Sequence, residues 1–166
     1  SGSPFTPGFS TTNSVDFTGT PTSGARIDVV GDPYKDVPAG TPGLPHGVRY
    51  FNPLAFSVPA VGSFGNAGVN IMYGPGYINH DVTLARKIAL GERREFQLKL
   101  EAFNVLNHVQ FTGVNSSFTY QPCTLGSTSD CISTPAGAFR NTNANIGALT
   151  GERGPRILSL EMRFQF

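Results

Sequence analysis

The sequence contains no tryptophan, and only 14% of its residues are charged, against a usual value of about 25%. Its net charge is +1 and it has no basic run, so it lacks the electrostatic footprint of a nucleic-acid-binding protein. It contains no stretch of about 18 apolar residues, which excludes an apolar transmembrane helix. A composition so poor in charge fits neither a helical enzyme nor a charged disordered tail.

Catalytic and ligand-binding signatures are also missing. His46, His80 and His108 are far apart in the sequence, and no metal-binding or catalytic motif surrounds any of them. Asp81 follows His80, but adjacent side chains of a strand point to opposite faces, which argues against a catalytic dyad. The Gly-rich segments lack the phosphate-binding pattern G-x-x-x-x-G-K-[ST]. We therefore expect no enzymatic activity and no catalytic, cofactor-binding or metal-binding residues.

Glycine and proline are abundant, at 20 and 13 residues, and 13 Phe and 5 Tyr supply the bulky apolar side chains. This composition is typical of strands joined by long, turn-rich loops, so we expect an all-β fold. We expect residues 1–77 to form a Gly/Pro/Ser-rich loop region with at most short strands. Either aromatic side chains hold this region in an ordered conformation, or the region pairs with other chains. The aromatic residues are Tyr50, Phe51, Phe56 and Phe64.

Residues 78–166 contain three segments that alternate between apolar and polar side chains, as amphipathic strands do. These segments are 78–90, 95–107 and 156–166, and we expect them to be antiparallel. The polar residues 91–94 between the first two indicate a hairpin turn. In a helix, at about 100° per residue, Phe96, Leu98 and Leu100 would scatter around the cylinder, so strands are favoured.

The last segment alternates with almost no exception. Ile157 is the one apolar residue on its polar face, and the apolar face carries five residues: Leu158, Leu160, Met162, Phe164 and Phe166. Its length matches the roughly 9–11 residues that a tilted transmembrane strand needs. An amphipathic strand that ends in an aromatic residue at the chain terminus is typical of the closing strand of an outer-membrane β-barrel.

Two cysteines, Cys123 and Cys131, lie close together in a Thr/Ser/Gly-rich stretch of the loop that we expect over residues 108–155. A disulfide that closes a short loop is the favoured interpretation, and it implies an oxidising compartment. A pair of free thiols is the alternative, whereas a metal site would need more ligands nearby.

Connection lengths suggest an orientation. Outer-membrane barrels have short periplasmic turns and longer extracellular loops. With a periplasmic C-terminus, the short turn 91–94 is periplasmic, and residues 1–77 and 108–155 lie outside the cell. The two cysteines then also lie outside, where a disulfide persists.

Seven short segments carry a family resemblance: VVGDP at 29–33, RYFNPLAF at 49–56, GSFGN at 62–66, GPGY at 74–77, NHDVTL at 79–84, EAFNVLNH at 101–108 and RFQF at 163–166. Together they resemble the C-terminal end of TonB-dependent outer-membrane receptors of the Oar-like type, which carry an N-terminal carboxypeptidase-regulatory-like domain. The resemblance implies a barrel of roughly 22 strands around a plug, which takes up a bulky substrate with energy passed on by TonB. It also implies that the barrel-assembly machinery recognises Phe166.

We expect the chain, which begins at Ser1 rather than Met, to be a C-terminal piece of a longer protein. With about three membrane-length strands, against roughly eight in the smallest barrels, it cannot close a barrel and is inactive alone. Its partners are then the remaining strands and plug, the TonB system and the assembly machinery, in the bacterial outer membrane. The alternative is a structural subunit whose unpaired strand edges join copies of itself into an extracellular cell-surface filament.

Overall fold

The structure is a computed structural model that describes residues 2–11, 16–19, 24–39, 44–128 and 131–166. Ser1, parts of the predicted 1–77 loop region and two residues between the cysteines lie outside this range. The chain forms two compact units. Unit 1 comprises Ser1–Pro75 and Thr112–Gly151, and unit 2 comprises Gly76–Phe111 and Glu152–Phe166.

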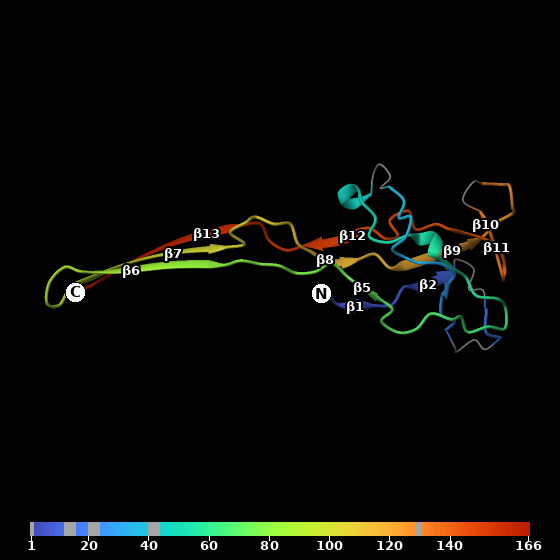
Figure 1. Cartoon of the computed structure of the whole chain (residues 1–166), viewed down its shortest axis with the longest axis horizontal. Helices are drawn as coiled ribbons and strands as arrows, with labels where there is room; N and C mark the ends of the chain where they lie inside the picture. Colours follow the sequence, from blue (N-terminus) through green and yellow to red (C-terminus); the bar gives the residue numbers. More distant parts are fainter. Residues whose placement is uncertain (1, 12–15, 20–23, 40–43, 129–130) are drawn as a thin grey trace. The chain divides into compact units, whose positions relative to one another are not determined.

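The fold is all-β, as the composition predicts (Figure 1). Its described helical segments are two single 3₁₀ turns, Pro45–Gly47 and Pro53–Ala55. The Asn52 side chain caps the second turn by accepting a hydrogen bond from the backbone N–H of Leu54 at 2.9 Å. Among the described residues, no helix has the length and apolarity needed to cross a membrane.

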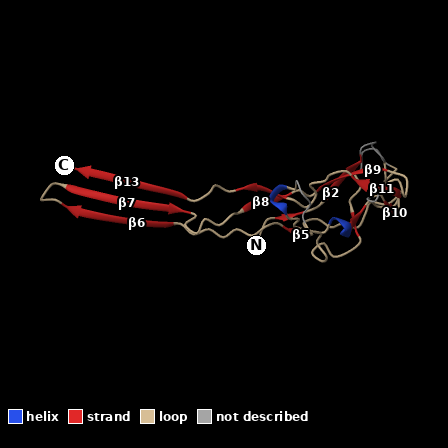
Figure 2. Cartoon of the chain, turned by 90° about the horizontal axis from the view of Figure 1, so that it is seen from above, coloured by secondary structure: helices blue, strands red, loops and turns tan. Residues whose placement is uncertain are grey.

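Unit 2 is built on a three-stranded antiparallel sheet in the order β13–β7–β6. Its strands are β6 (Val82–Ala89), β7 (Glu95–Phe103) and β13 (Ile157–Gln165). Figure 2 shows them side by side, with the C-terminus at the same end as the turn that joins β6 to β7. Nine consecutive residue pairs join β13 to β7, and eight join β7 to β6, so the ladder runs the full length of the sheet.

The three strands are shorter than the predicted segments 78–90, 95–107 and 156–166. At the end of the sheet away from the turn, the Asp81 carboxylate accepts a hydrogen bond from the backbone N–H of Asn104 at 2.9 Å. Asn104 and Asn107 have positive φ angles of 51° and 49°. Asparagine tolerates this left-handed conformation, which ends the extended ladder at Phe103.

Within its described residues, unit 1 contains short strands in four small sheets. The largest has the order β10–β11–β9–β2, in which β2 and β9 are parallel, and the other three are the pairs β1–β5, β3–β4 and β12–β8. The strand bounds are β1 Pro4–Phe5, β2 Gly8–Thr11, β3 Asp28–Val29, β4 Phe56–Ser57, β5 Met72–Tyr73, β8 Phe111–Val114, β9 Ser117–Pro122, β10 Ile132–Thr134, β11 Gly137–Asn141 and β12 Leu149–Glu152.

An aromatic-rich core holds unit 1 together, and both chain segments of the unit contribute to it. Its buried members are Phe17, Ile27, Phe51, Ala55, Phe56, Val58, Ala67, Met72, Phe118, Tyr120, Phe139 and Ile146. Of the four aromatic residues expected to order the first region, Phe51 and Phe56 are buried and Tyr50 packs against the core. Phe64 does not take part, since it is 59% exposed.

The segment 108–155, which we expected to be a loop, carries strands β8 to β12 instead. Its Gly, Asn, Ser and Thr residues supply the turns, and short strands lie between them. Asn143 shows how the turns are held: its side-chain amide donates to the carbonyl of Ser117 at 2.7 Å and to Oδ1 of Asn115 at 3.2 Å. Such side-chain bonds replace the long ladders that this segment lacks.

Candidate functional site

The register of the unit 2 sheet sorts its side chains onto two faces, because residues directly opposite each other share a face. One face carries rows such as Leu84–Leu100–Leu160 and Ile88–Phe96–Phe164. We call it the apolar face. Its members are Val82, Leu84, Arg86, Ile88, Phe96, Leu98, Leu100, Ala102, Leu158, Leu160, Met162 and Phe164.

Four of the five predicted terminal-strand residues lie on the apolar face: Leu158, Leu160, Met162 and Phe164. The fifth, Phe166, follows the end of β13 and is 95% exposed. Its ring centroid lies 6.2 Å from that of Phe164, so the two rings continue the apolar surface to the chain terminus.

The opposite face is polar and carries the remaining charges of the sheet. Lys99 Nζ lies 2.8 Å from Glu101 Oε1, two positions along the same strand. Lys87 Nζ lies 3.3 Å from Glu95 Oε1 across the β6–β7 pair. The sheet therefore separates charge and apolar surface across its thickness.

Most of the apolar face is open in this chain, and Leu160, at its centre, is 57% exposed. A contiguous apolar surface on a sheet of this length is not stable against water, and it needs lipid or another protein. Strands of eight and nine residues approach the span of a tilted transmembrane strand. The sheet thus has the dimensions and the two-faced pattern of a membrane β-barrel wall.

Arg86 is the one charged member of the apolar face. It lies opposite Leu98, which lies opposite Met162, so its row is otherwise apolar. A charged side chain on the lipid face of a barrel costs about 2–4 kcal/mol at the bilayer midplane and much less near the interfaces. The depth of Arg86 therefore decides its energetic effect.

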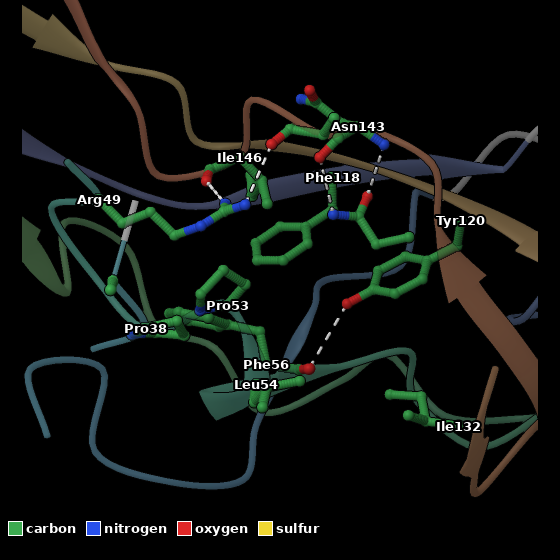
Figure 3. Close-up of a pocket in the computed structure, with 13 residues that line it drawn as sticks. Pro38, Arg49, Pro53, Leu54, Phe56, Phe118, Tyr120, Ile132, Asn143 and Ile146 are labelled. Carbon is green, nitrogen blue, oxygen red and sulfur yellow. Dashed lines mark hydrogen bonds between the residues drawn. The ribbon is translucent and has the colours of Figure 1, made fainter. Parts of the chain in front are cut away.

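A pocket of about 480 Å³ lies within unit 1 (Figure 3). It is mainly apolar, and it is lined by Pro38, Ala39, Arg49, Pro53, Leu54, Phe56, Phe118, Tyr120, Ile132, Asn141, Asn143, Ala144 and Ile146. This volume falls in the range of small-molecule sites.

Polar groups around the pocket bond to the protein itself. The Arg49 guanidinium donates to the carbonyl of Ala144 at 3.1 Å and also to the carbonyl of Ile146. The Tyr120 hydroxyl donates to the carbonyl of Phe56 at 3.4 Å (Figure 3). The pocket can therefore hold an apolar group, with the Arg49 charge as its one ionic feature.

Burial changes the acidity of two tyrosines of unit 1. It raises the pKa of the Tyr120 hydroxyl far above the ordinary value of 10.0, because the phenolate would lose its hydration. It also raises the pKa of Tyr50, with a smaller contribution from the neighbouring Tyr34. Both hydroxyls stay protonated at neutral pH.

Cys123 and Cys131 form the expected disulfide. The backbone N–H of Cys123 donates to the carbonyl of Ala138 at 3.0 Å, which ties the bridge to the β9–β11–β10 edge of the unit 1 sheet. The bridge closes a short loop, because the two cysteines are eight positions apart in the sequence.

Two of the three histidines line the same cavity although they are distant in sequence. His80 and His108 line a small cavity of about 80 Å³ in unit 2, together with Ile78, Asn104 and Leu106. In the part of the chain that the structure describes, no three potential metal ligands cluster. The expectation that the chain has no metal, cofactor or catalytic residue stays a prediction.

Sequence reasoning missed the core and pocket residues of β9. The segment Ser117–Pro122 (SFTYQP) places Phe118 and Tyr120 two positions apart, on one side of the strand. That short alternation was the available signal, but the surrounding Gly, Asn and Ser residues indicated a loop.

These features define the chain as part of a membrane β-barrel: an all-β fold, membrane-length strands and a sheet with one apolar and one polar face. The sequence matches the family described as "Outer membrane beta barrel domain" over residues 1–159. The chain therefore belongs to this family, which places it in the outer membrane of bacteria. No curated protein and no solved structure matches it.

Proposed function

We propose that the chain is the C-terminal segment of a TonB-dependent outer-membrane receptor, which takes up a bulky substrate and needs the remaining strands and plug to act. The observation that carries the proposal is the β13 strand, whose apolar residues and terminal Phe166 form one continuous surface. The family membership supports a barrel, and the segments EAFNVLNH and RFQF support this type of receptor by resemblance. No catalytic step is part of the proposal.

The orientation of the chain follows from its connections. The turn between Ala89 and Glu95 is short, whereas the segments of unit 1 are long. In this family short turns face the periplasm and long connections face outward. We infer that Phe166 and the turn are periplasmic, and that unit 1, with its disulfide and its pocket, is extracellular.

The test uses the full-length receptor that contains this chain. Binding of the purified C-terminal domain of TonB to the receptor should be measurable by isothermal titration calorimetry. It should disappear when the receptor's TonB-binding segment is deleted. A receptor that folds and inserts but never binds TonB would contradict the energy-coupled uptake and leave a barrel of another kind.

A second measurement, on the chain alone, distinguishes the filament hypothesis from the receptor hypothesis. Electron microscopy of the detergent-free chain should show no regular filaments if the apolar face belongs in a bilayer. Filaments with a constant repeat would favour self-assembly through the free edges of β6 and β13.

A further inference from the structure

Arg86 is the one charged residue on the apolar face of the unit 2 sheet. Its opposite neighbours are apolar, and the carboxylates nearest in register, Glu95, Glu101 and Glu161, lie on the polar face. In the described part of the chain, no ion pair or hydrogen bond of the Arg86 side chain is present, and the residue is exposed. A guanidinium in such a place needs an anion from outside this chain.

The position of Arg86 along the strand gives its depth. It lies four positions before Leu90 at the turn, which corresponds to about 13 Å along the strand and to about 9 Å of depth at a tilt of about 45°. The next row toward the turn contains Phe96 and Phe164, and aromatic residues mark the level of the headgroups in barrels. A long cationic side chain at this depth reaches the headgroup level by snorkelling.

We propose that Arg86 binds the phosphate of a phospholipid in the periplasmic leaflet, while Leu98 and Met162 contact its acyl chains. A guanidinium pairs with phosphate through two parallel hydrogen bonds. The lipid is the occupant that the surroundings favour, because the rest of the apolar face has the pattern of the lipid-facing wall of an outer-membrane barrel. The choice of leaflet rests on the orientation given under Proposed function.

The first experiment measures lipid binding to the purified full-length barrel in detergent by native mass spectrometry. The probes are phosphatidylglycerol and diacylglycerol, which has no phosphate. Arg86→Gln should weaken the retention of phosphatidylglycerol about tenfold, the loss of one charged pair. It should leave diacylglycerol unchanged, and Arg86→Lys should retain part of the binding.

Arg163→Gln is the matched control. Arg163 follows Met162 in β13, so it lies at nearly the depth of Arg86 but on the polar face, opposite Gln97. Its substitution should leave phosphatidylglycerol binding as in the wild type. Equal binding by Arg86→Gln and the wild type, or an equal loss in Arg163→Gln, would overturn the proposal.

A second experiment distinguishes a lipid phosphate from an acidic side chain elsewhere in the full barrel as the anion that pairs with Arg86. Unfolding is measured in vesicles of digalactosyldiacylglycerol, a bilayer lipid that has no phosphate, with and without phosphatidylglycerol. The wild type should be stabilised by phosphatidylglycerol, and Arg86→Gln should not be. If Arg86→Gln is destabilised equally in both vesicles, the anion belongs to the protein and the proposal is wrong.

The lipid proposal and the receptor proposal fail in different ways. A barrel that never binds TonB but retains phosphatidylglycerol through Arg86 refutes only the uptake function. A receptor that binds TonB but is indifferent to Arg86→Gln in both lipid experiments refutes only the lipid site. If the protein prefers lipid A to phosphatidylglycerol, the leaflet assignment, and with it the proposal, is wrong.

Discussion

The rings of Phe118 and Tyr120 are parallel to within 1°, with their centroids 5.6 Å apart. The two residues alternate on one side of β9, and both are buried in the core of unit 1. The Tyr120 hydroxyl also donates to the carbonyl of Phe56. The stacked pair therefore connects the second segment of unit 1 to the first.

This arrangement predicts the cost of removing the Tyr120 ring. We expect Tyr120→Ala to lower the free energy of unfolding of unit 1 by about 3–5 kcal/mol, because it leaves a cavity in a packed core. Tyr120→Phe should cost only about 0.5–1.5 kcal/mol, the value of one hydrogen bond. Native-state hydrogen exchange of the β9 amides measures both changes. Phe64→Ala is the control, and a loss as large as that of Tyr120→Ala would contradict the assigned core.

The raised pKa of Tyr120 predicts a dependence of stability on pH. The unfolded chain releases the phenolic proton near pH 10, whereas the folded chain keeps it. The contribution of Tyr120 to the free energy of unfolding of unit 1 should be constant below about pH 9 and should decrease above pH 10, by up to about 1.4 kcal/mol per pH unit. Tyr50, whose pKa is also raised, acts in the same direction. The free energy of unfolding of Tyr120→Phe should decrease less steeply above pH 10 than that of the wild type. An unchanged slope would contradict the assignment of the effect to Tyr120.

The disulfide predicts a local effect of reduction. Reduction of a disulfide that closes a loop of this size should lower the free energy of unfolding of the strands near Cys123 by about 2–3 kcal/mol. Hydrogen exchange under dithiothreitol should show faster exchange in β10 and β11 and no change in β6, β7 or β13. The double variant Cys123→Ala/Cys131→Ala should reproduce the effect and no longer respond to dithiothreitol. Equal acceleration in the unit 2 sheet would show that the bridge acts on the whole chain.

The two faces of the unit 2 sheet predict opposite responses to a new charge. Leu160→Lys, on the apolar face, should lower the free energy of unfolding in phospholipid vesicles by about 2–4 kcal/mol. Ser159→Lys, one position earlier on the polar face and opposite Glu101, should change it by about 0.5 kcal/mol or less. Reversible unfolding of the full-length barrel in vesicles measures both. A larger cost for Ser159→Lys would reverse the assignment of the faces.

The terminal aromatic residue predicts an effect on assembly rather than on stability. Phe166 is exposed and contacts only the Phe164 ring in the described aromatic pairs. Phe166→Ser should therefore leave in-vitro folding nearly unchanged but lower the amount of folded barrel in the outer membrane several-fold. Gln165→Ser, on the other face, should not. Membrane fractions analysed by heat-modifiable gel migration provide the measurement, and equal levels in both variants would remove the proposed recognition of Phe166.

The sequence predicted the unit 2 sheet because its pattern is local. Eight or nine alternating residues, such as those of β7, identify a strand and its faces without knowledge of the partner strand. Arg86 occupies an apolar position in the alternation of residues 78–90, but only the register of the sheet shows that it has no carboxylate partner among the described residues. Unit 1 was not predictable in the same way, because strands of two to six residues are too short to show a period. Its core joins residues such as Ile27 and Phe139, whose proximity no local pattern encodes.

The parallel pairing of β2 with β9 determines the order in which parts of the chain can fold. Gly8 pairs with Ser117, so β2 has no partner strand until roughly a hundred further residues have been synthesised and exported. Contacts between such distant segments form slowly. Until then the apolar residues of the early segment are exposed to proteases and to misassembly. Unit 1 can therefore be completed only after its two chain segments, 1–75 and 112–151, have arrived on the same side of the membrane.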